Sequence, residues 1–426
     1  MKQKLKIIFS SQGLLQSLKT LIGSTFATGI SAISLMIYSR VLGPEKFGEF
    51  SVGFALVMIL TRINDIGFNN AILRYGSEKE SNNEKNFIYS FTLKYKLIIS
   101  LLIIATGIIF SGSITKLFNF SNHSIIFIAL TVGLSTVYYE HLLNTLQSLH
   151  RFNQAILINI VQASTKLIWA IALLITSITS SLVTFAWYVA APIVPVIFWK
   201  KFVTKDTIIN FKTRNSKIQS QVLMLAKHSS VGLIAAGFIE NIDVLYLQKY
   251  LSTYEVGLYS GVSRISLVFA IGAYSLGNVL YPRVAKYKNK KDIKAYIKKA
   301  FAIVLLSVIG FLLFLPLGKL SILLTIGSEY ISGLNILYLL TASSFIAIAV
   351  VPFIALFFSF KANWYFSVSG VLQLIIVLIG NTIFVPKYGL EAAAWTRIVT
   401  RLVLFCFTLV TGMILYRKTY VQKVID

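Results

Sequence analysis

Stretches of about twenty apolar residues recur along the whole chain, and each is long enough to cross the hydrocarbon core of a membrane as a helix. The chain is 56% hydrophobic and only 13% charged, whereas soluble domains carry roughly a quarter charged residues. In lipid a chain must satisfy its backbone polar groups internally, so the sequence predicts an all-α integral membrane protein. We expect about twelve transmembrane helices, near residues 20–40, 48–72, 87–111, 124–147, 155–178, 182–199, 224–249, 256–281, 300–322, 330–357, 363–386 and 389–416.

The positive residues fall mainly on one side of the membrane if the N-terminus is placed in the cytoplasm and the helices alternate. The cytoplasmic segments then hold 26 of the 40 Lys and Arg residues, the external loops hold six, and the predicted spans hold the other eight. Lys and Arg gather on cytoplasmic loops, so the sequence predicts that both termini are cytoplasmic. The net charge of +25 then reflects topology and the anionic inner leaflet, rather than nucleic-acid binding.

A polar segment at 200–219 divides the predicted helices into two sets of six. Several residues recur at a fixed offset of 209, including the pairs Gly48 and Gly257, and Asn69 and Asn278. The sequence therefore predicts two pseudo-symmetric six-helix lobes, residues 1–210 and 211–426. Such internal repeats are typical of transporters, with the substrate site near the membrane midplane between the repeats.

Five segments resemble the Wzx-type flippases of O-antigen and other polysaccharides, which belong to a superfamily with multidrug and toxin extrusion exporters and lipid II flippases. The segments are SRVLGPEKFGEFSVGFAL (39–56), DIGFNNAILRY (65–75), EVGLYSGVSRIS (255–266), LYPRVAKY (280–287) and GLEAAAWTRIVT (389–400). The resemblance implies a V-shaped pair of lobes, alternating access and an undecaprenyl-pyrophosphate-linked oligosaccharide as cargo. It also implies the bacterial inner membrane as location, with polysaccharide polymerase and glycosyltransferases as partners.

Charged side chains inside the predicted spans are the candidates for function, because each is costly in lipid and usually faces a cavity or a partner. Eight bases stand against four acids, an excess that suits an anionic cargo. The bases expected to bind substrate are Arg62, Lys166, Arg264, Arg397 and Arg401. The acids expected to hold these cations apart, or to couple transport to a Na⁺ or H⁺ gradient, are Asp65, Glu240 and Asp243.

The same charges also have structural interpretations, as ion pairs or as lysines that extend to the membrane surface. The alternative pairs are Arg62 with Asp65, Asp243 with Arg264, and Lys166 with Glu140. The lysines expected to reach the inner surface are Lys94, Lys96 and Lys227. Arg62, Asp65 and Asn69 are spaced to line one face of the second predicted helix.

Two other functions remain open. A cation-coupled exporter of small drugs has the same predicted fold, but residues 20–39 lack the carboxylate expected in its first helix. A membrane glycosyltransferase or polymerase would need catalytic carboxylates and a large external loop. The sequence has no nucleotide-binding motif and no His spacing typical of a metal site, so we expect no enzymatic activity, catalytic residue, bound cofactor or metal.

The charge distribution predicts the orientation of the chain. Reporter fusions at residue 426 and within 200–219 should be active only when the reporter works in the cytoplasm, because Lys and Arg concentrate on that side. Fusions at Lys116 and Lys319, in the predicted external loops, serve as controls. They should be active only when the reporter works outside the cytoplasm. A terminal fusion active only outside the cell would contradict the prediction.

Overall fold

The computed structural model describes residues 12–120, 123–176, 179–198, 209–287, 289–362 and 364–420, with backbone only for 12–21 and 420. Both termini, residues 200–208 of the predicted 200–219 loop and the predicted helix ends at 178, 199 and 363 lie outside these residues. Within the described residues every regular element is a helix and none is a strand. The predicted all-α fold is therefore confirmed.

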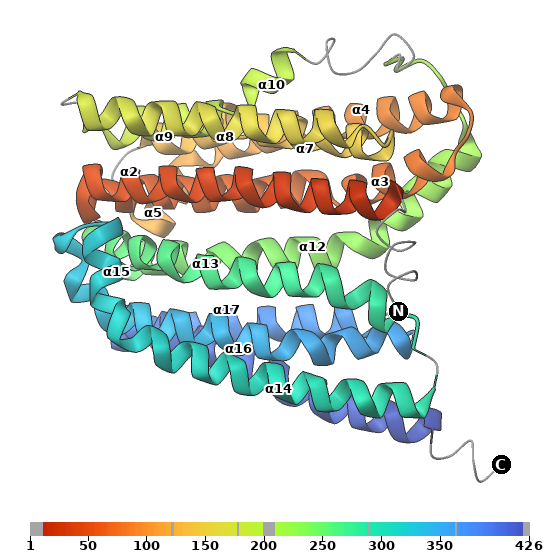
Figure 1. Cartoon of the computed structure of the whole chain (residues 1–426). Coiled ribbons are helices and arrows are strands. Elements are labelled where there is room, and N and C mark those ends of the chain that lie inside the picture. The colour runs from red at the N-terminus through yellow and green to blue at the C-terminus, as the bar shows by residue number, and fades with distance from the viewer. Residues whose placement is uncertain are drawn as a thin grey trace. The chain divides into compact units, whose positions relative to one another are not determined.

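The chain forms two compact units. Unit 1 contains the described residues up to Leu42 together with Gly53–Gly237, and unit 2 contains Gly43–Val52 and the described residues from Phe238 onward. The long helices of each unit run roughly side by side in Figure 1. The predicted lobe boundary at residue 210 stays a prediction.

Unit 1 is built from helices that begin and end close to the predicted apolar runs. Its elements are α2 (Gln12–Asp65, in part), α3 (Phe68–Glu78), α4 (Asn82–Ile109), α5 (Ser111–Phe118), α6 (His123–Thr131), α7 (Ser135–Ser148), α8 (Phe152–Ile175), α9 (Ser181–Ala190), α10 (Ile193–Ile197) and the first part of α12 (Ser216–Tyr250). The break between α6 and α7, and that between α9 and α10 at Pro192, divide two predicted helices into shorter pieces.

Unit 2 is organised around α16, which packs against α13, α14 and α17. Its elements after α12 are α13 (Thr253–Val284), α14 (Lys290–Phe314), η1 (Leu315–Leu317), α15 (Gly318–Thr325), η2 (Ser328–Gly333), α16 (Leu334–Ser359) and α17 (Trp364–Tyr420). Helix α14 begins ten residues before its predicted apolar run, because Ile293 and Tyr296 bury an apolar face on the helix bundle while its lysines stay exposed.

Nine helices among the described residues are long and apolar enough to cross a membrane, and Ser181–Ile197 is a shorter apolar one. Helix α2 holds the first predicted span and residues 48–65 of the second across a kink at Gly43, and α17 holds the last two spans, from Trp364 onward, across a kink at Gly389. Both glycines have positive φ, 69° and 61°, a conformation that costs glycine little. The count of twelve stays a prediction.

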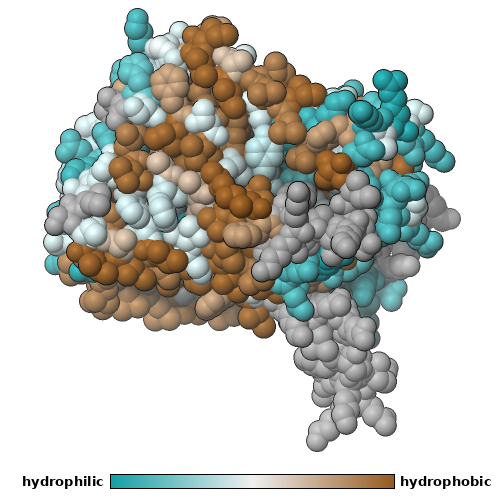
Figure 2. All heavy atoms as spheres, turned by 90° about the horizontal axis from the view of Figure 1, so that it is seen from above, coloured by the Kyte–Doolittle hydropathy of each residue, from teal (hydrophilic) through white to brown (hydrophobic). Residues whose placement is uncertain are grey.

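Large apolar side chains remain exposed along several helices. On α14 they include Phe301, Leu305, Leu306 and Leu312, each more than half exposed. Figure 2 shows many hydrophobic residues over the face it presents, with hydrophilic residues gathered toward two opposite edges. Water-soluble monomers rarely expose such surfaces, so these side chains face lipid.

Gly48 and Gly257, which the repeat analysis paired, lie against each other within unit 2. A Cβ added at Gly257 would lie 1.6 Å from the carbonyl oxygen of Pro44, and one added at Gly48 would lie 2.0 Å from that of Thr253. Backbone atoms cannot move aside as a flexible side chain can. The contact between α13 and residues 44–48 therefore requires glycine on both sides.

Replacement of Gly257 by Ala should destabilise the protein. The clash with the Pro44 backbone forces the two segments apart, and overpacking of this kind costs about 1–3 kcal/mol or more. We expect the apparent Tm of the detergent-solubilised protein to fall by roughly 5 °C. Gly370→Ala is the matched control, because no atom lies within 4 Å of its added Cβ. Equal Tm values for the two variants would contradict the close packing.

Candidate functional site

The first group of charged residues in unit 1 forms where α2 ends and α3 begins. Ile66 and Gly67 have positive φ and break the helix between Asp65 and Phe68. Asp65 Oδ1 accepts a hydrogen bond from the backbone N–H of Asn69 at 3.0 Å. The carboxylate thereby satisfies a donor that the first turn of α3 would otherwise leave without a partner.

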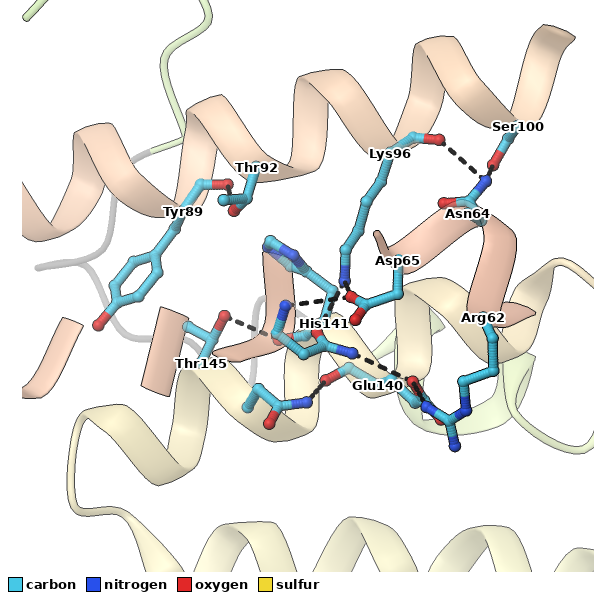
Figure 3. Close-up of polar contacts among 12 residues, drawn as sticks. Arg62, Asn64, Asp65, Tyr89, Thr92, Lys96, Ser100, Glu140, His141 and Thr145 are labelled. Carbon is cyan, nitrogen blue, oxygen red and sulfur yellow. Dashed lines mark hydrogen bonds and ion pairs between the residues drawn. The ribbon is translucent and has the colours of Figure 1, made fainter. Parts of the chain in front are cut away.

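This break brings Asp65 and Asn69 to side chains from α4 and α7, as Figure 3 shows for the labelled Asp65, Lys96 and Glu140. Lys96 Nζ lies 2.9 Å from Asp65 Oδ1 and 2.7 Å from Asn69 Oδ1. The amide of Asn69 donates to Glu140 Oε2 at 3.1 Å, and Arg62 Nη1 lies 3.3 Å from the same oxygen. We call these five residues the unit 1 charge cluster; its two cations and two carboxylates balance.

Exposure increases from one end of the unit 1 charge cluster to the other. The side chains of Lys96 and Asp65 are 0% and 3% exposed, whereas those of Arg62 and Glu140 are 36% and 20% exposed. The Lys96–Asp65 pair is therefore locked in the protein interior. Arg62 and Glu140 form the partly exposed end of the cluster.

A second group, in unit 2, surrounds the fully buried carboxylate of Asp243 on α12. Tyr259 Oη from α13 donates to Oδ2 at 2.9 Å, and Asn381 Nδ2 from the first limb of α17 donates to Oδ1 at 2.8 Å. Arg397 Nε, from the second limb of α17, also donates to Oδ2. Arg397 Nη2 donates to the carbonyl oxygen of Glu240 at 2.8 Å. We call these five residues the unit 2 charge cluster; it ties three helices together.

Arg401 lies one turn beyond Arg397 on α17, and its Nη1 donates to Oε1 of Gln373 at 3.0 Å. Arg401 enters none of the ion pairs formed among the described residues. At 1.5 Å per residue it is about 18 Å along the helix from the kink at Gly389, which is near mid-membrane depth for a core about 30 Å thick. Its hydrogen-bond partner is therefore a neutral amide, and Glu240 is near enough to act on its charge without forming an ion pair.

Lys166 and Arg264 belong to neither cluster, whereas Glu240 contributes its backbone carbonyl oxygen to the unit 2 charge cluster. The ammonium of Lys166, a largely buried residue of α8, lies 4.0 Å from the ring centroid of Tyr188. Arg264 is buried on α13, and Glu240 is exposed on α12. The structure brings Asp243 and Arg397 together; substrate and coupling roles for all eight predicted residues stay predictions.

Several predicted structural pairings are wrong. Arg62 pairs with Glu140 instead of Asp65, and Lys166 stacks on Tyr188 instead of pairing with Glu140. Asp243 pairs with Arg397, where Arg264 was expected. The cause is common to all three: spacing along one helix or across one hairpin does not reveal which distant helix lies alongside.

Two further expectations for unit 1 are corrected. Lys96 does not extend to the membrane surface, because it is fully buried against Asp65. Arg62, Asp65 and Asn69 do not share one helix, because α2 ends at Asp65. Gly67 permits the helix break with its φ of 89°. The pattern of apolar residues in the sequence did not reveal this break.

The sequence analysis missed Tyr259 and Asn381, the neutral members of the unit 2 charge cluster, and Gln373, the partner of Arg401. Asn381 interrupts the apolar run LIIVLIGNTIFV, which was a usable signal because amides are costly in lipid without a partner. Gln373 interrupts the same apolar stretch just before this run and gave the same kind of signal, whereas Tyr259 gave none in a chain with 21 Tyr residues. No group of three or more His, Cys, Asp and Glu side chains in the described part of the chain could hold a metal ion.

A family described as "Polysaccharide biosynthesis protein" has a sequence model that matches residues 14–288. A Shigella flexneri protein named as an O-antigen transporter is 24% identical over 350 residues, which cover 80% of this chain and 83% of the relative.

Two solved structures have the same fold. One is an inward-facing multidrug resistance transporter of the MATE family, with a TM-score of 0.72, 13% identity, and coverage of 91% of this chain and 95% of that one. The other is the lipid II flippase MurJ in an inward closed conformation, with a TM-score of 0.70, 17% identity, and coverage of 95% and 91%. At these identities the likeness concerns the fold alone.

Loss of one partner from the Lys96–Asp65 pair should destabilise unit 1. Lys96→Met leaves a carboxylate buried without its cation, and breaking a buried pair costs about 3–5 kcal/mol. We expect a clear fall in the apparent Tm of the purified protein, and partial recovery in the double variant Lys96→Met/Asp65→Leu. Lys227→Met, at an exposed position of α12, is the control. If the single and control variants melted together, the pair would not be structural.

Proposed function

This chain belongs to the polysaccharide biosynthesis protein family, and we propose that it is a flippase for a polyprenyl-pyrophosphate-linked oligosaccharide. The cargo would cross the bacterial inner membrane by alternating access, with both termini of the protein in the cytoplasm. The O-antigen transporter name of the Shigella flexneri relative supports this class of cargo. The fold shared with transporters of the MATE family and with a lipid II flippase supports the mode of movement.

The observation that carries the proposal is Arg401, a cation at mid-helix whose hydrogen-bond partner is the neutral Gln373. A cation in this position is costly unless an anion reaches it for part of the time. A pyrophosphate carries at least two negative charges, which cannot enter hydrocarbon without compensation. Arg401 would supply part of that compensation without first having to break an ion pair.

Arg62 would add a second site of moderate strength. Its partner Glu140 is shared with Asn69, and both ends of the pair are partly exposed. Several moderate sites serve transport better than one tight site, because the cargo must also leave. We propose the same substrate role for Lys166, Arg264 and Arg397, with Arg397 free to act only when it releases Asp243.

Coupling to a Na⁺ or H⁺ gradient would act through the carboxylates. A cation bound by Asp65, Glu240 or Asp243 would weaken the hold of that carboxylate on its partner and so free an arginine for the cargo. Polysaccharide polymerase and glycosyltransferases would be partners in the pathway. A cationic drug fits this set of residues poorly, since the arginines would repel it, and an enzymatic role is not part of the proposal.

Substitution of Arg401 tests the proposal in cells. In a bacterial strain that depends on this protein, Arg401→Ala should lower surface polysaccharide at least tenfold, a loss that corresponds to about 1.4 kcal/mol of binding or barrier energy. Arg401→Lys should keep part of the activity, because it keeps the charge but loses the planar fork. The measurement is surface polysaccharide per unit of membrane-inserted protein.

Arg417→Ala is the matched control, because it removes an exposed arginine from the last turn of the same helix. Export should then stay normal. Normal export with both Arg401→Ala and Arg62→Ala would contradict the cationic substrate site. Drug efflux that depends on the protein, without an effect on polysaccharide, would favour an exporter of small molecules.

A further inference from the structure

A polar pocket of about 330 Å³ lies in unit 1, and none of its lining residues belongs to either charge cluster. Helix α4 contributes one wall, and residues 210–219, which lead into α12, contribute the other. The lining residues are Phe87, Ser90, Phe91, Lys94, Tyr95, Asn210, Phe211, Thr213, Arg214 and Gln219. The volume is at the lower end of the range for ligand sites, which is about 300–1,000 Å³.

The wall formed by residues 210–219 is fixed by hydrogen bonds. The backbone N–H of Asn210 donates to Ser90 Oγ on α4 at 2.8 Å. Thr213 Oγ1 donates to the carbonyl oxygen of Asn210 at 3.0 Å, and Ile218 N donates to Asn215 Oδ1 at 3.1 Å. The segment that carries Arg214 is therefore attached to α4 at one end and to the start of α12 at the other.

The pocket carries a net positive charge. Lys94 and Arg214 are its two charged lining residues, and no acid lines it. Neither residue enters an ion pair formed among the described residues. Ser90 and Gln219 add a hydroxyl and an amide group that can donate hydrogen bonds. This combination fits a phosphate group, which accepts charge-assisted hydrogen bonds from Lys and Arg.

The surface next to the pocket is apolar. Lipid-facing side chains on α4 begin at Leu97, less than one turn after Lys94, and continue through Ile98, Leu101 and Leu102. Tyr95 and three Phe side chains line the pocket itself, and aromatic residues are typical of the membrane interface. A molecule with its phosphate in the pocket would have an apolar surface beside it for acyl chains.

We propose that this pocket binds the phosphate headgroup of an anionic membrane lipid. The phosphate contacts Lys94 and Arg214, and the acyl chains lie along the exposed face of α4 that begins at Leu97. The bound lipid joins α4 to the segment that enters α12 and so stabilises this end of unit 1. The site is separate from Arg401 and Arg62, so it does not depend on the identity of the transported cargo.

A thermal-shift titration of the full-length protein in detergent tests the site. Phosphatidylglycerol should raise the apparent Tm, because a ligand that binds the folded state stabilises it, and phosphatidylcholine should do so much less. In the double variant Lys94→Ala/Arg214→Ala, at least tenfold more phosphatidylglycerol should be needed for the same rise. The conservative variant Lys94→Arg/Arg214→Lys should respond like the wild type.

The matched control is Lys212→Ala/Lys217→Ala, which removes two exposed lysines of the same segment outside the pocket. It should keep the wild-type response. A response lost equally in the control and in Lys94→Ala/Arg214→Ala would mean that general surface charge binds the lipid, and would overturn the proposal. So would a wild-type response in Lys94→Ala/Arg214→Ala.

Two further ligands separate the possible sources of the phosphate. Soluble glycerol phosphate that raised the Tm as much as the lipid would make the site a free-anion site and overturn the lipid assignment. Polyprenyl phosphate that bound far more tightly than phosphatidylglycerol would assign the pocket to the cargo lipid and likewise overturn it. Native mass spectrometry of the phosphatidylglycerol complex should show one bound lipid that Lys94→Ala/Arg214→Ala loses, even if that variant is less stable.

Discussion

A charged side chain buried within a membrane protein costs several kcal/mol unless a partner compensates it, and both units are arranged around such partners. In unit 1, Lys96 reaches Asp65 and Asn69 and so fixes α4 against the junction of α2 and α3. In unit 2, Asp243 accepts hydrogen bonds from Tyr259, Asn381 and Arg397, so one carboxylate holds α13 and both limbs of α17 to α12. Loss of either carboxylate would leave its cation, Lys96 or Arg397, with neutral hydrogen-bond partners but without an ion-pair partner.

The fold was largely readable from the sequence, because apolar runs and positive loops are direct consequences of the bilayer. The charged members of the clusters were also found, since an ion in an apolar run stands out. Their partners were not, because Asp243 and Arg397 are 154 residues apart and only packing makes them neighbours. The prediction that Lys96 reaches the membrane surface failed for the same reason. The sequence shows where Lys96 lies along α4, but it does not show that Asp65 of α2 lies beside it.

The intramembrane charges differ in how firmly they are held, and we infer different roles from this difference. The Lys96–Asp65 pair and the carboxylate of Asp243 are buried and suit a structural role, although Arg397, which donates to Asp243, is 23% exposed. Arg62 and Arg401 are less constrained, the first by a partly exposed carboxylate and the second by an amide. In the proposed flippase, each of these residues would offer its positive charge to a pyrophosphate, while the buried carboxylates would keep each unit rigid.

Flipping of a purified lipid-linked oligosaccharide by the protein in proteoliposomes tests the proposed function most directly. The lipid carries a fluorescent sugar, and a membrane-impermeant quencher added outside reports the fraction that has crossed the bilayer. We expect crossing to be much faster with the wild-type protein than in protein-free vesicles, and Arg401→Ala to lower the rate at least tenfold, about 1.4 kcal/mol in the barrier. Crossing at the protein-free rate with properly folded wild-type protein, under an imposed Na⁺ or H⁺ gradient as well as without one, would contradict the proposed function.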